Sequence, residues 1–337
     1  MTARATALVL TAGLGTRLRP LTCLRAKAAV PVNGEPLVRR ILRWLAASRV
    51  RDVVLNLHHE PHTIASLVGD GSDLGVRVRY SWEQPVLGSG GGPRHALPLM
   101  ADTFLIANGD TLTNVDLAAL ASEHHHSRAA VTMALIPNPR PDKYGGVGVS
   151  ADGWVTGFTR RRIQPVSPKP RAGEGGFHFI GVQMVQARVF AGVEDGVPSE
   201  SVSALYPRLI AEDPHAVRAF VSDAAFQDIG TPEDYLRTSL ELAAQEGDRL
   251  ASGARLRIDQ TASAVRTVIW DDVTIGAAAS LTDCIVTDGV LIPAGARYER
   301  CAILPAGACD PEAGHRIEGD LLVAPLNANG HIGKTSE

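Results

Sequence analysis

Hydrophobic and polar positions in the N-terminal third of the chain switch repeatedly between the period of a strand and that of a helix. The unbroken apolar run 7–10 predicts a buried strand, and apolar residues then recur at helical spacing over 37–45. Further along, the pattern predicts a strand at 53–57, a short helix at 64–68 and a third strand at 76–80. This βαβαβ order is typical of an α/β domain with parallel strands.

The next apolar run, 104–107, predicts a buried strand that ends at an Asn-Gly-Asp segment, 108–110. Open α/β sheets bind ligands at the carboxyl ends of their strands, so we expect functional residues at this point. Residues 137–176 are rich in Pro, Gly and Arg, and a short hairpin is predicted around 152–153. We expect this insertion to shape one wall of a pocket. Helical periodicity returns over 232–246.

The C-terminal part of the chain follows a different rhythm, in which large residues recur every six positions. They form two sets with a one-residue slip between them: Ile269, Ile275 and Leu281, then Val286, Ile292 and Tyr298. Small residues fill the intervals, as a parallel β-helix of six-residue units requires. The alternative is a pair of ordinary edge strands. The pattern therefore predicts an N-terminal domain over 1–247, a short β-helix over 255–325 and a tail over 326–337.

Composition narrows the class of protein. Hydrophobic residues make up 45% of the 337 residues and charged residues 20%, a balance that excludes a disordered chain. The formal net charge of -3 provides no overall positive field for DNA or RNA, so we expect no nucleic-acid partner. No apolar run is long enough to span a membrane, and the N-terminus lacks the apolar core of a signal peptide. We expect a cytoplasmic protein without a membrane partner.

The segment 10–20 directly follows the first predicted strand and is rich in small residues. Gly13 and Gly15 would let backbone N–H groups approach a phosphate closely, Thr16 can begin a helix, and Arg17 adds positive charge. A dinucleotide fingerprint is excluded because Leu18 stands where its third glycine belongs. Taken alone, the segment could equally be a tight turn.

The order of several motifs resembles the signature of the sugar-1-phosphate nucleotidylyltransferases over residues 5 to about 245. The matching segments are Gly13-x-Gly15-Thr16-Arg17-Leu18-Arg19-Pro20, Lys27, Pro31-Val32-x-Gly34, Glu83-x-x-x-Leu87-Gly88-Ser89, Asn108-Gly109-Asp110, Tyr144-Gly145-Gly146-Val147 and Asp228-Ile229-Gly230-Thr231-Pro232. The resemblance implies a Rossmann-like mixed sheet of the GT-A-like nucleotidyltransferase type. It further implies that the C-terminal repeat is a left-handed parallel β-helix, giving an α/β catalytic domain with a short β-helix behind it.

The resemblance also implies a defined reaction, in which a sugar 1-phosphate oxygen attacks the α-phosphorus of a nucleoside triphosphate and pyrophosphate leaves. Catalysis of this kind consists mainly of positioning anions and neutralising charge. Arg17 would bind the triphosphate, and Lys27 would bring the sugar phosphate against the α-phosphate. Asp110 and Asp228 would hold Mg²⁺, which prefers a few hard oxygen ligands. Without the resemblance, Asp110 could begin a turn and Asp228 could cap a helix.

Two sets of binding residues follow from the resemblance. The nucleotide-binding set is Leu10, Ala12, Gly13, Gly15, Thr16, Arg17, Glu83, Gly88, Ser89 and Asn108. The sugar-phosphate set is Lys27, Gly146, Arg160 and Gly181. The chain departs from the family at Arg160-Arg161-Arg162, where a Glu-Lys-Pro sequence is usual, and this leaves the sugar open. A solvated basic loop is the alternative interpretation of these arginines.

Three functions remain open from the sequence. The first is a guanylyltransferase that acts on mannose 1-phosphate or a related sugar phosphate. The second is a uridylyltransferase acting on an amino-sugar or N-acetylmuramate 1-phosphate, which the glycines at 69–71 and 90–92 also resemble. The third is a catalytically silent regulatory subunit that binds NDP-sugars. We expect a homo-oligomer, most simply a dimer joined through exposed strands of the β-helix.

Overall fold

A computed structural model describes residues 6–159, 176–247 and 251–326 of the chain. These residues pack as two compact units. The first unit is Met1–Gly13 with Val38–Gln227, and the second is Leu14–Leu37 with Asp228–Glu337. Residues 14–37, which include Gly15 and Lys27, therefore pack with the C-terminal part of the chain, a grouping that differs from the domain boundary predicted near residue 247.

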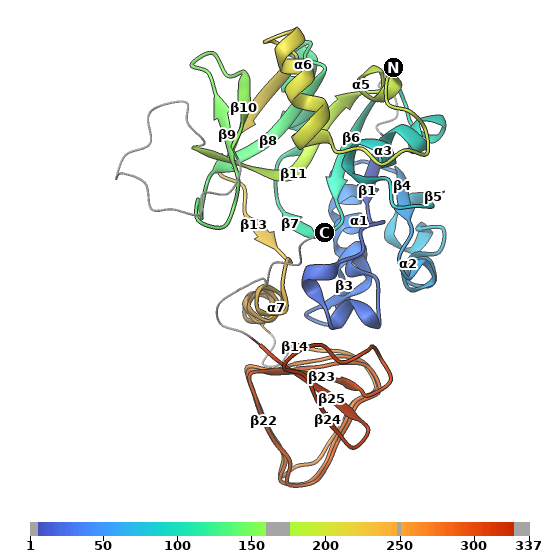
Figure 1. The fold of residues 1–337 in the computed structure, drawn as a ribbon, viewed down its shortest axis with the longest axis vertical. Coiled ribbons are helices and arrows are strands. Elements are labelled where there is room, and N and C mark those ends of the chain that lie inside the picture. The colour runs from blue at the N-terminus through green and yellow to red at the C-terminus, as the bar shows by residue number, and fades with distance from the viewer. Residues whose placement is uncertain (1–5, 160–175, 248–250, 327–337) are drawn as a thin grey trace. The chain divides into compact units, whose positions relative to one another are not determined.

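The first unit is built on a mixed sheet with strand order β10-β9-β11-β6-β1-β4-β5, in which β8 pairs with β11 and β12 (Figure 1). The neighbours β6, β1, β4 and β5 are parallel, with Leu8 opposite both Ile106 and Val54. A two-stranded sheet joins β7 and β13. The strands are β1 (Thr6–Leu10), β4 (Asp52–Leu57), β5 (Arg77–Trp82), β6 (Thr103–Asn108), β7 (Thr111–Thr113), β8 (Val131–Pro137), β9 (Gly146–Val149), β10 (Val155–Thr159), β11 (Phe177–Gln186), β12 (Val217–Val221) and β13 (Phe226–Asp228).

Complete burial explains why the central strands are apolar runs and do not alternate. Every residue of β4 is buried, and so are the first four of β1, as expected for parallel strands covered on both faces. This confirms the strands predicted at 7–10, 53–57 and 104–107. The core beneath them includes Leu8, Val54, Phe104 and Ile106, each fully buried.

Helices surround the sheet. Helix α4 packs on β8, β11 and β12, while α3 contacts β1 and β4, and α6 contacts β10 and β12. The predicted helix at 37–45 is confirmed as α1, whose Val38, Ile41, Leu42 and Leu45 are all buried. The helices are α1 (Leu37–Ala47), α2 (Pro61–Val68), α3 (Gly88–Ala96), α4 (Leu117–Ser127), α5 (Arg188–Ala191) and α6 (Tyr206–Glu212). The part of the chain that the structure describes contains no helix long and apolar enough to cross a membrane.

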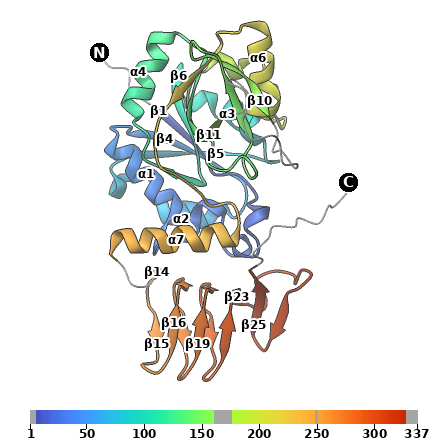
Figure 2. The ribbon, with the colours of Figure 1, turned by 90° about the vertical axis from the view of Figure 1, so that its left-hand side faces the viewer.

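The second unit contains helix α7 (Pro232–Glu246), as predicted, and a strand stack, by which we mean β14 to β25 (Figure 2). Its strands form three parallel sheets, β14-β17-β20-β23, β15-β18-β21 and β16-β19-β22. The first of these sheets is extended by the antiparallel strands β25 and β24. The bounds are β14 (Ala251–Ser252), β15 (Arg257–Ile258), β16 (Ser263–Val265), β17 (Val268–Ile269), β18 (Thr274–Ile275), β19 (Ser280–Thr282), β20 (Ile285–Val286), β21 (Leu291–Ile292), β22 (Arg297–Glu299), β23 (Cys301–Pro305), β24 (Arg316–Glu318) and β25 (Leu321–Pro325).

The register of the strand stack explains the slip in the six-residue repeat. Paired residues are 17 positions apart in all three sheets, for example Ile269 with Val286 and Ile275 with Ile292. Three six-residue units would need one residue more, so one corner of each turn is shorter. That corner is made by Arg266, Asp283 and Arg300 in successive turns, and all three have positive φ. Arg266 also forms an ion pair with Asp283 of the next turn.

Segment 14–37 of the second unit consists of short elements only. Pro31 lies opposite Pro36 in a small antiparallel pair of strands, and single 3-10 turns precede it. The elements are 3-10 turns at Thr16–Leu18, Leu21–Cys23 and Lys27–Ala29, and the strands β2 (Pro31–Val32) and β3 (Glu35–Pro36). Since so little regular structure supports this segment, its shape depends on side-chain contacts.

Buried His124 of α4 gives the first unit a pH-dependent stability. Its Nδ1 lies 2.9 Å from Thr132 Oγ1, its Nε2 has no partner, and burial lowers its pKa to about 4. As the pH falls below about 6.5, His124 binds a proton in the unfolded chain but stays neutral in the native protein. The native state therefore loses stability as the pH falls from about 6.5 towards 4. We expect the free energy of unfolding to fall by about 2 kcal/mol between pH 7 and pH 5 from this residue.

Urea unfolding at the two pH values would test this expectation. The variant His124→Leu should lose that part of the pH dependence, whereas His126→Leu, at an exposed position of the same helix, should keep it. An unchanged pH dependence in His124→Leu would contradict the assignment.

Candidate functional site

A buried polar relay connects the carboxyl ends of β1, β4 and β5. Asn56, the second-last residue of β4, accepts hydrogen bonds at Oδ1 from the backbone N–H groups of Thr11 (2.6 Å) and Ala12 (3.3 Å). The Thr11 hydroxyl also donates to the Asn56 carbonyl. These bonds hold the turn that follows β1, and they occupy two of the N–H groups that a ligand could otherwise use. A Cβ built on Gly13, the next residue, meets nothing within 4 Å.

The relay continues from Asn56 to Glu83. The Asn56 amide donates to Glu83 Oε1 at 2.7 Å, and the Leu87 N–H donates to Glu83 Oε2 at 2.9 Å. The Glu83 side chain is therefore buried and bonded inside the protein, and it orders the loop between β5 and α3. Gly92 is required by this arrangement, since a Cβ there would lie 2.6 Å from Glu83 Oε1. Sequence reasoning missed Asn56, because only the parallel register of β1, β4 and β5 brings it to these partners.

Gly88 begins helix α3, so the glycines at 88–92 form a helix entry. The Ser89 hydroxyl donates to Glu200 Oε2 at 2.6 Å and accepts from the Ser201 N–H at 2.9 Å. The Gly90 N–H donates to the Ser199 carbonyl at 2.7 Å. Gly88 has φ +73° and a Cβ there would lie 2.7 Å from that carbonyl. Segment 199–201 thus fixes the position of the first turn of α3.

The relay predicts a sharp response to a single atom change at Asn56. The variant Asn56→Asp would place a carboxylate oxygen where Nδ2 now donates to Glu83. We expect the free energy of unfolding to fall by about 2–4 kcal/mol, because two buried carboxylates would face each other without a donor. Urea unfolding measures this. Asn114→Asp is the matched control, since exposed Asn114 uses only Oδ1, as acceptor from the Ala225 N–H; equal losses in the two variants would contradict the relay.

The carboxyl end of β6 brings together two residues that the sequence predicted. Asn108 packs on Gly181 of β11, where a Cβ would lie 2.6 Å from Asn108 Nδ2 and where φ is +78°. Gly109 lies against the end of β1, since its N–H donates to the Leu10 carbonyl at 3.0 Å. Half-buried Asp110 follows directly. The sheet therefore places Asp110 beside the turn that the relay holds.

The predicted sugar-phosphate residue Gly146 begins β9, where its N–H donates to Thr159 Oγ1 at 3.2 Å. Next to it, Tyr144 stacks on His178 with ring centroids 4.4 Å apart, and both rings meet the edge or face of Phe226. This half-buried aromatic group was not predicted. The other predicted residue of this set on the insertion, Arg160, lies outside the described residues, as do its two arginine neighbours.

The glycine-rich segment in the second unit brings Gly15 and Lys27 together. Gly15 has φ +62°, and a Cβ there would lie 2.7 Å from Thr22 Cγ2 and 3.2 Å from Lys27 Cβ. The Leu18 N–H and the Thr22 hydroxyl both donate to the Gly15 carbonyl, at 2.9 and 3.0 Å. A side chain at 15 would therefore clash with Thr22 and crowd Lys27, and it would be strained at this φ, which explains the glycine.

The same segment exposes Thr16 and Arg17, while Lys27 is half-buried. Asp228 is also half-buried and ends β13, just before the Thr231 cap of α7. Asp110 belongs to the first unit, whereas Arg17, Lys27 and Asp228 belong to the second. The gathering of these four side chains around one substrate stays a prediction. Among the described residues, no group of three or more His, Cys, Asp or Glu side chains could hold a metal.

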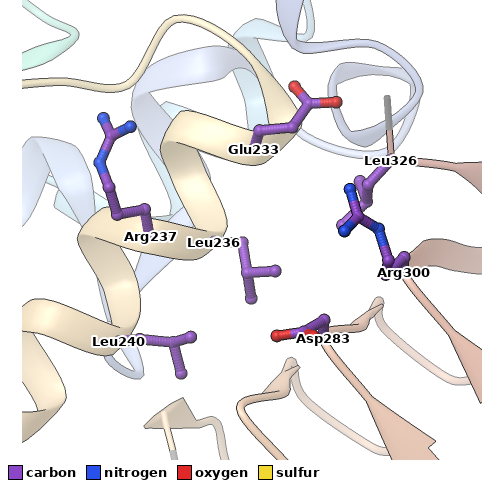
Figure 3. A pocket seen from close by; sticks show the side chains of 7 residues that line it. All are labelled: Glu233, Leu236, Arg237, Leu240, Asp283, Arg300 and Leu326. Atoms are coloured by element: carbon purple, nitrogen blue, oxygen red, sulfur yellow. The ribbon is translucent and has the colours of Figure 1, made fainter. Parts of the chain in front are cut away.

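A cavity of about 390 Å³ lies elsewhere in the second unit, between α7 and the strand stack (Figure 3). Two of its charged lining residues have partners, since Arg237 pairs with Asp234 and Asp283 pairs with Arg266. No predicted site residue is among those that line it, which are Glu233, Leu236, Arg237, Leu240, Asp283, Arg300 and Leu326.

The mixed sheet and the edge formed by β1, β4, β5 and β6 define a nucleotidyltransferase fold. Among solved structures, the chain is similar in fold to HddC from Yersinia pseudotuberculosis. The TM-score is 0.60 and the sequence identity 21%, and the match covers 71% of this chain and 99% of HddC. The sequence matches the Nucleotidyl transferase family over residues 6–245. The chain belongs to this family, which confirms the predicted resemblance to the sugar-1-phosphate nucleotidylyltransferases.

Curated relatives share the match. The mannose-1-phosphate guanylyltransferase of Mycobacterium tuberculosis is 32% identical over 305 residues, covering 87% of this chain and 83% of the relative. The D-glycero-alpha-D-manno-heptose 1-phosphate guanylyltransferase of Campylobacter jejuni is 29% identical over 229 residues, covering 68% of this chain and 96% of the relative. The first of these matches extends beyond the first 245 residues of the chain and into the strand stack.

Proposed function

We propose that this protein is a sugar-1-phosphate guanylyltransferase that uses GTP and releases pyrophosphate, with mannose 1-phosphate as the first candidate acceptor. One observation carries the proposal: the match to a mannose-1-phosphate guanylyltransferase runs along most of both chains, strand stack included. The heptose relative matches a shorter stretch and supports a related sugar phosphate as the alternative acceptor.

In the proposed reaction, a phosphate oxygen of the sugar 1-phosphate forms a bond to the α-phosphorus of GTP, and the bond to the β-phosphate oxygen breaks. Exposed Arg17 would grip the triphosphate, and its bidentate guanidinium suits the pyrophosphate that departs. Lys27, held against Gly15, would draw the attacking phosphate towards the α-phosphate as a point charge. Positioning and charge neutralisation then supply most of the rate enhancement.

The nucleotide would bind over the turn held by Asn56. Gly13 leaves open space above the backbone, so a flat base and ribose could approach the chain there. Glu83 and Ser89 would act indirectly in this proposal, because both are bonded within the protein. The sugar phosphate would lie towards Gly146, Asn108 and Gly181.

Members of this family typically use a divalent metal ion, and we propose Mg²⁺. The donor set fits, because Mg²⁺ takes one or two protein carboxylates and keeps its other positions for water and phosphates. Asp110 and Asp228 are half-buried carboxylates that end or follow strands. They would hold the ion, whose charge when bound screens the phosphate oxygens.

The test is to incubate the protein with each of the four NTPs and a panel of sugar 1-phosphates, and to measure pyrophosphate. We expect the fastest release with GTP and mannose 1-phosphate. Faster release with UTP and N-acetylmuramate 1-phosphate would support the uridylyltransferase alternative. No pyrophosphate with any pair, combined with tight NDP-sugar binding, would support the silent regulatory subunit.

We further propose that the strand stack is a left-handed parallel β-helix with 17-residue turns. Its three sheets of short parallel strands support this architecture. Assembly into a homodimer remains part of the proposal, and light scattering on the full chain measures it: a monomer mass would contradict it.

A further inference from the structure

Arg25 lies two residues before Lys27 and reaches the strand stack. Its guanidinium donates to both carboxylate oxygens of Asp288, at 2.7 Å from Nε and 2.6 Å from Nη2, and to Asp271 at 2.9 Å. The side chain is only 14% exposed. It also lies over the ring of Trp270, with 5.3 Å between the guanidinium carbon and the ring centroid.

A second connection holds the same segment on the other side of Lys27. The fully buried Tyr235 of α7 donates its hydroxyl hydrogen to the Pro31 carbonyl at 2.5 Å and accepts from Trp270 Nε1 at 2.7 Å. Burial raises the pKa of this phenol well above its usual value, so it stays protonated and able to donate. Residues 25 and 31 are thus both fixed to the neighbourhood of Trp270, and Lys27 lies between them.

The acids that receive Arg25 are placed by the 17-residue register. Asp271 and Asp288 follow β17 and β20 at equivalent positions of successive turns, and the Asp271 N–H donates to Asp288 Oδ1 at 3.1 Å. Burial raises the pKa of Asp288 in spite of the bonds from Arg25. Burial alone would lower the pKa of Arg25, and the two carboxylates more than offset it.

This ion cluster is a poor device for stability alone. Removing such charges from water costs free energy that their mutual attraction only partly offsets. Well-packed apolar side chains at the same positions commonly stabilise a fold equally well or better. A bidentate bond nevertheless sets the direction and distance of the backbone that carries it. Segment 14–37 has little regular structure, so a fixed anchor beside Lys27 has a clear use there.

We propose that Arg25 is a positioning residue for nucleotidyl transfer: clamped by Asp271 and Asp288 of the strand stack, it holds Lys27 where the sugar phosphate must be delivered. The inference rests on the proposed function. It gives the strand stack an indirect role in the reaction, because its acids fix the segment that carries a phosphate-binding cation. Misplacement of a reacting group by about 1 Å can cost about 100-fold in rate.

The first experiment compares Arg25→Met with Arg255→Met. Arg255 makes the same kind of bidentate pair, with Asp272 at 2.6 Å for both bonds, but on the exposed surface of the strand stack. With the most active substrate pair, we expect Arg25→Met to lower kcat about 30-fold with KM for GTP within about twofold, and Arg25→Lys to recover part of the loss. Arg255→Met should stay within about twofold of wild type. Equal losses in the two Met variants would overturn the proposal.

The second experiment asks whether Arg25 acts through Lys27. Adding Arg25→Met to a Lys27→Met background should cause less than about a twofold further loss, because the group being positioned is gone. A further loss as large as in the wild-type background would mean an independent effect and would overturn the proposal. Thermal melting of every variant identifies losses that merely follow unfolding.

A measurement independent of catalysis separates this inference from the proposed function. Hydrogen exchange at amides 24–30 should be about tenfold faster or more in Arg25→Met than in wild type or Arg255→Met. Unchanged exchange would overturn the clamp even if the enzyme is active. Faster exchange in a protein that forms no pyrophosphate with any substrate pair would keep the clamp but overturn the proposed function, and with it the catalytic role of Arg25.

Discussion

Replacing Asp110 by Asn is expected to lower kcat by about 1,000-fold or more, with little change in the folded state. The side chain keeps its shape but loses the charge that a Mg²⁺ ligand needs, and the charge on the phosphates is then no longer screened in the transition state. Asp110 lies two residues beyond the end of β6 and is only half-buried, so the substitution leaves the core untouched. Steady-state pyrophosphate release over a range of Mg²⁺ concentrations measures the effect.

Asp102 provides the matched control, because it is exposed and precedes the same strand at its opposite end. Asp102→Asn should turn over at the wild-type rate. Wild-type turnover in Asp110→Asn would show that this carboxylate is not a metal ligand, and the proposed mechanism would lose its cation.

Replacing Arg17 by Ala should lower kcat/KM for GTP by about 100- to 1,000-fold. The guanidinium is exposed in the glycine-rich segment, and its proposed partners are the phosphates that carry the most charge as pyrophosphate departs. Arg17→Lys should fall between the wild type and Arg17→Ala, because an ammonium keeps the charge but cannot bind two oxygens in parallel. Initial rates at varied GTP give the three values.

Arg208 on α6 serves as the control for a lost surface arginine, since it is also exposed. If Arg17→Ala retained the kcat/KM of Arg208→Ala, the triphosphate contact would have to be assigned elsewhere. Tight binding of pyrophosphate by Arg17→Ala would argue in the same direction.

Many elements of both units could be predicted because their signals are local. The apolar run 7–10 predicted a buried strand, and the helical periodicity over 232–246 predicted α7 with the bounds observed. The six-residue repeat indicated stacked strands, although the 17-residue turn became clear only from the paired residues. These features depend on short stretches of chain, whose periodicity is visible without knowing their neighbours.

Contacts between distant segments were not predictable in the same way. Glu83 was expected to face the nucleotide, whereas its carboxylate is bonded to Asn56 and to the Leu87 N–H inside the protein. Nothing in the local sequence distinguishes a glutamate that binds a ligand from one that orders a loop. Arg25 carried no motif at all, and only the positions of Asp271 and Asp288 give it a partner.

The packing of segment 14–37 with the C-terminal unit has a practical consequence for anyone who exchanges parts between relatives. Codon 247 looks like a natural place to divide the gene. A cut there would nevertheless separate segment 14–37 from the carboxylates of Asp271 and Asp288 and from the indole of Trp270, which hold Arg25. Chimeras that import a foreign tail would need to import a matching residue 25 as well, or supply new acids for the arginine already there.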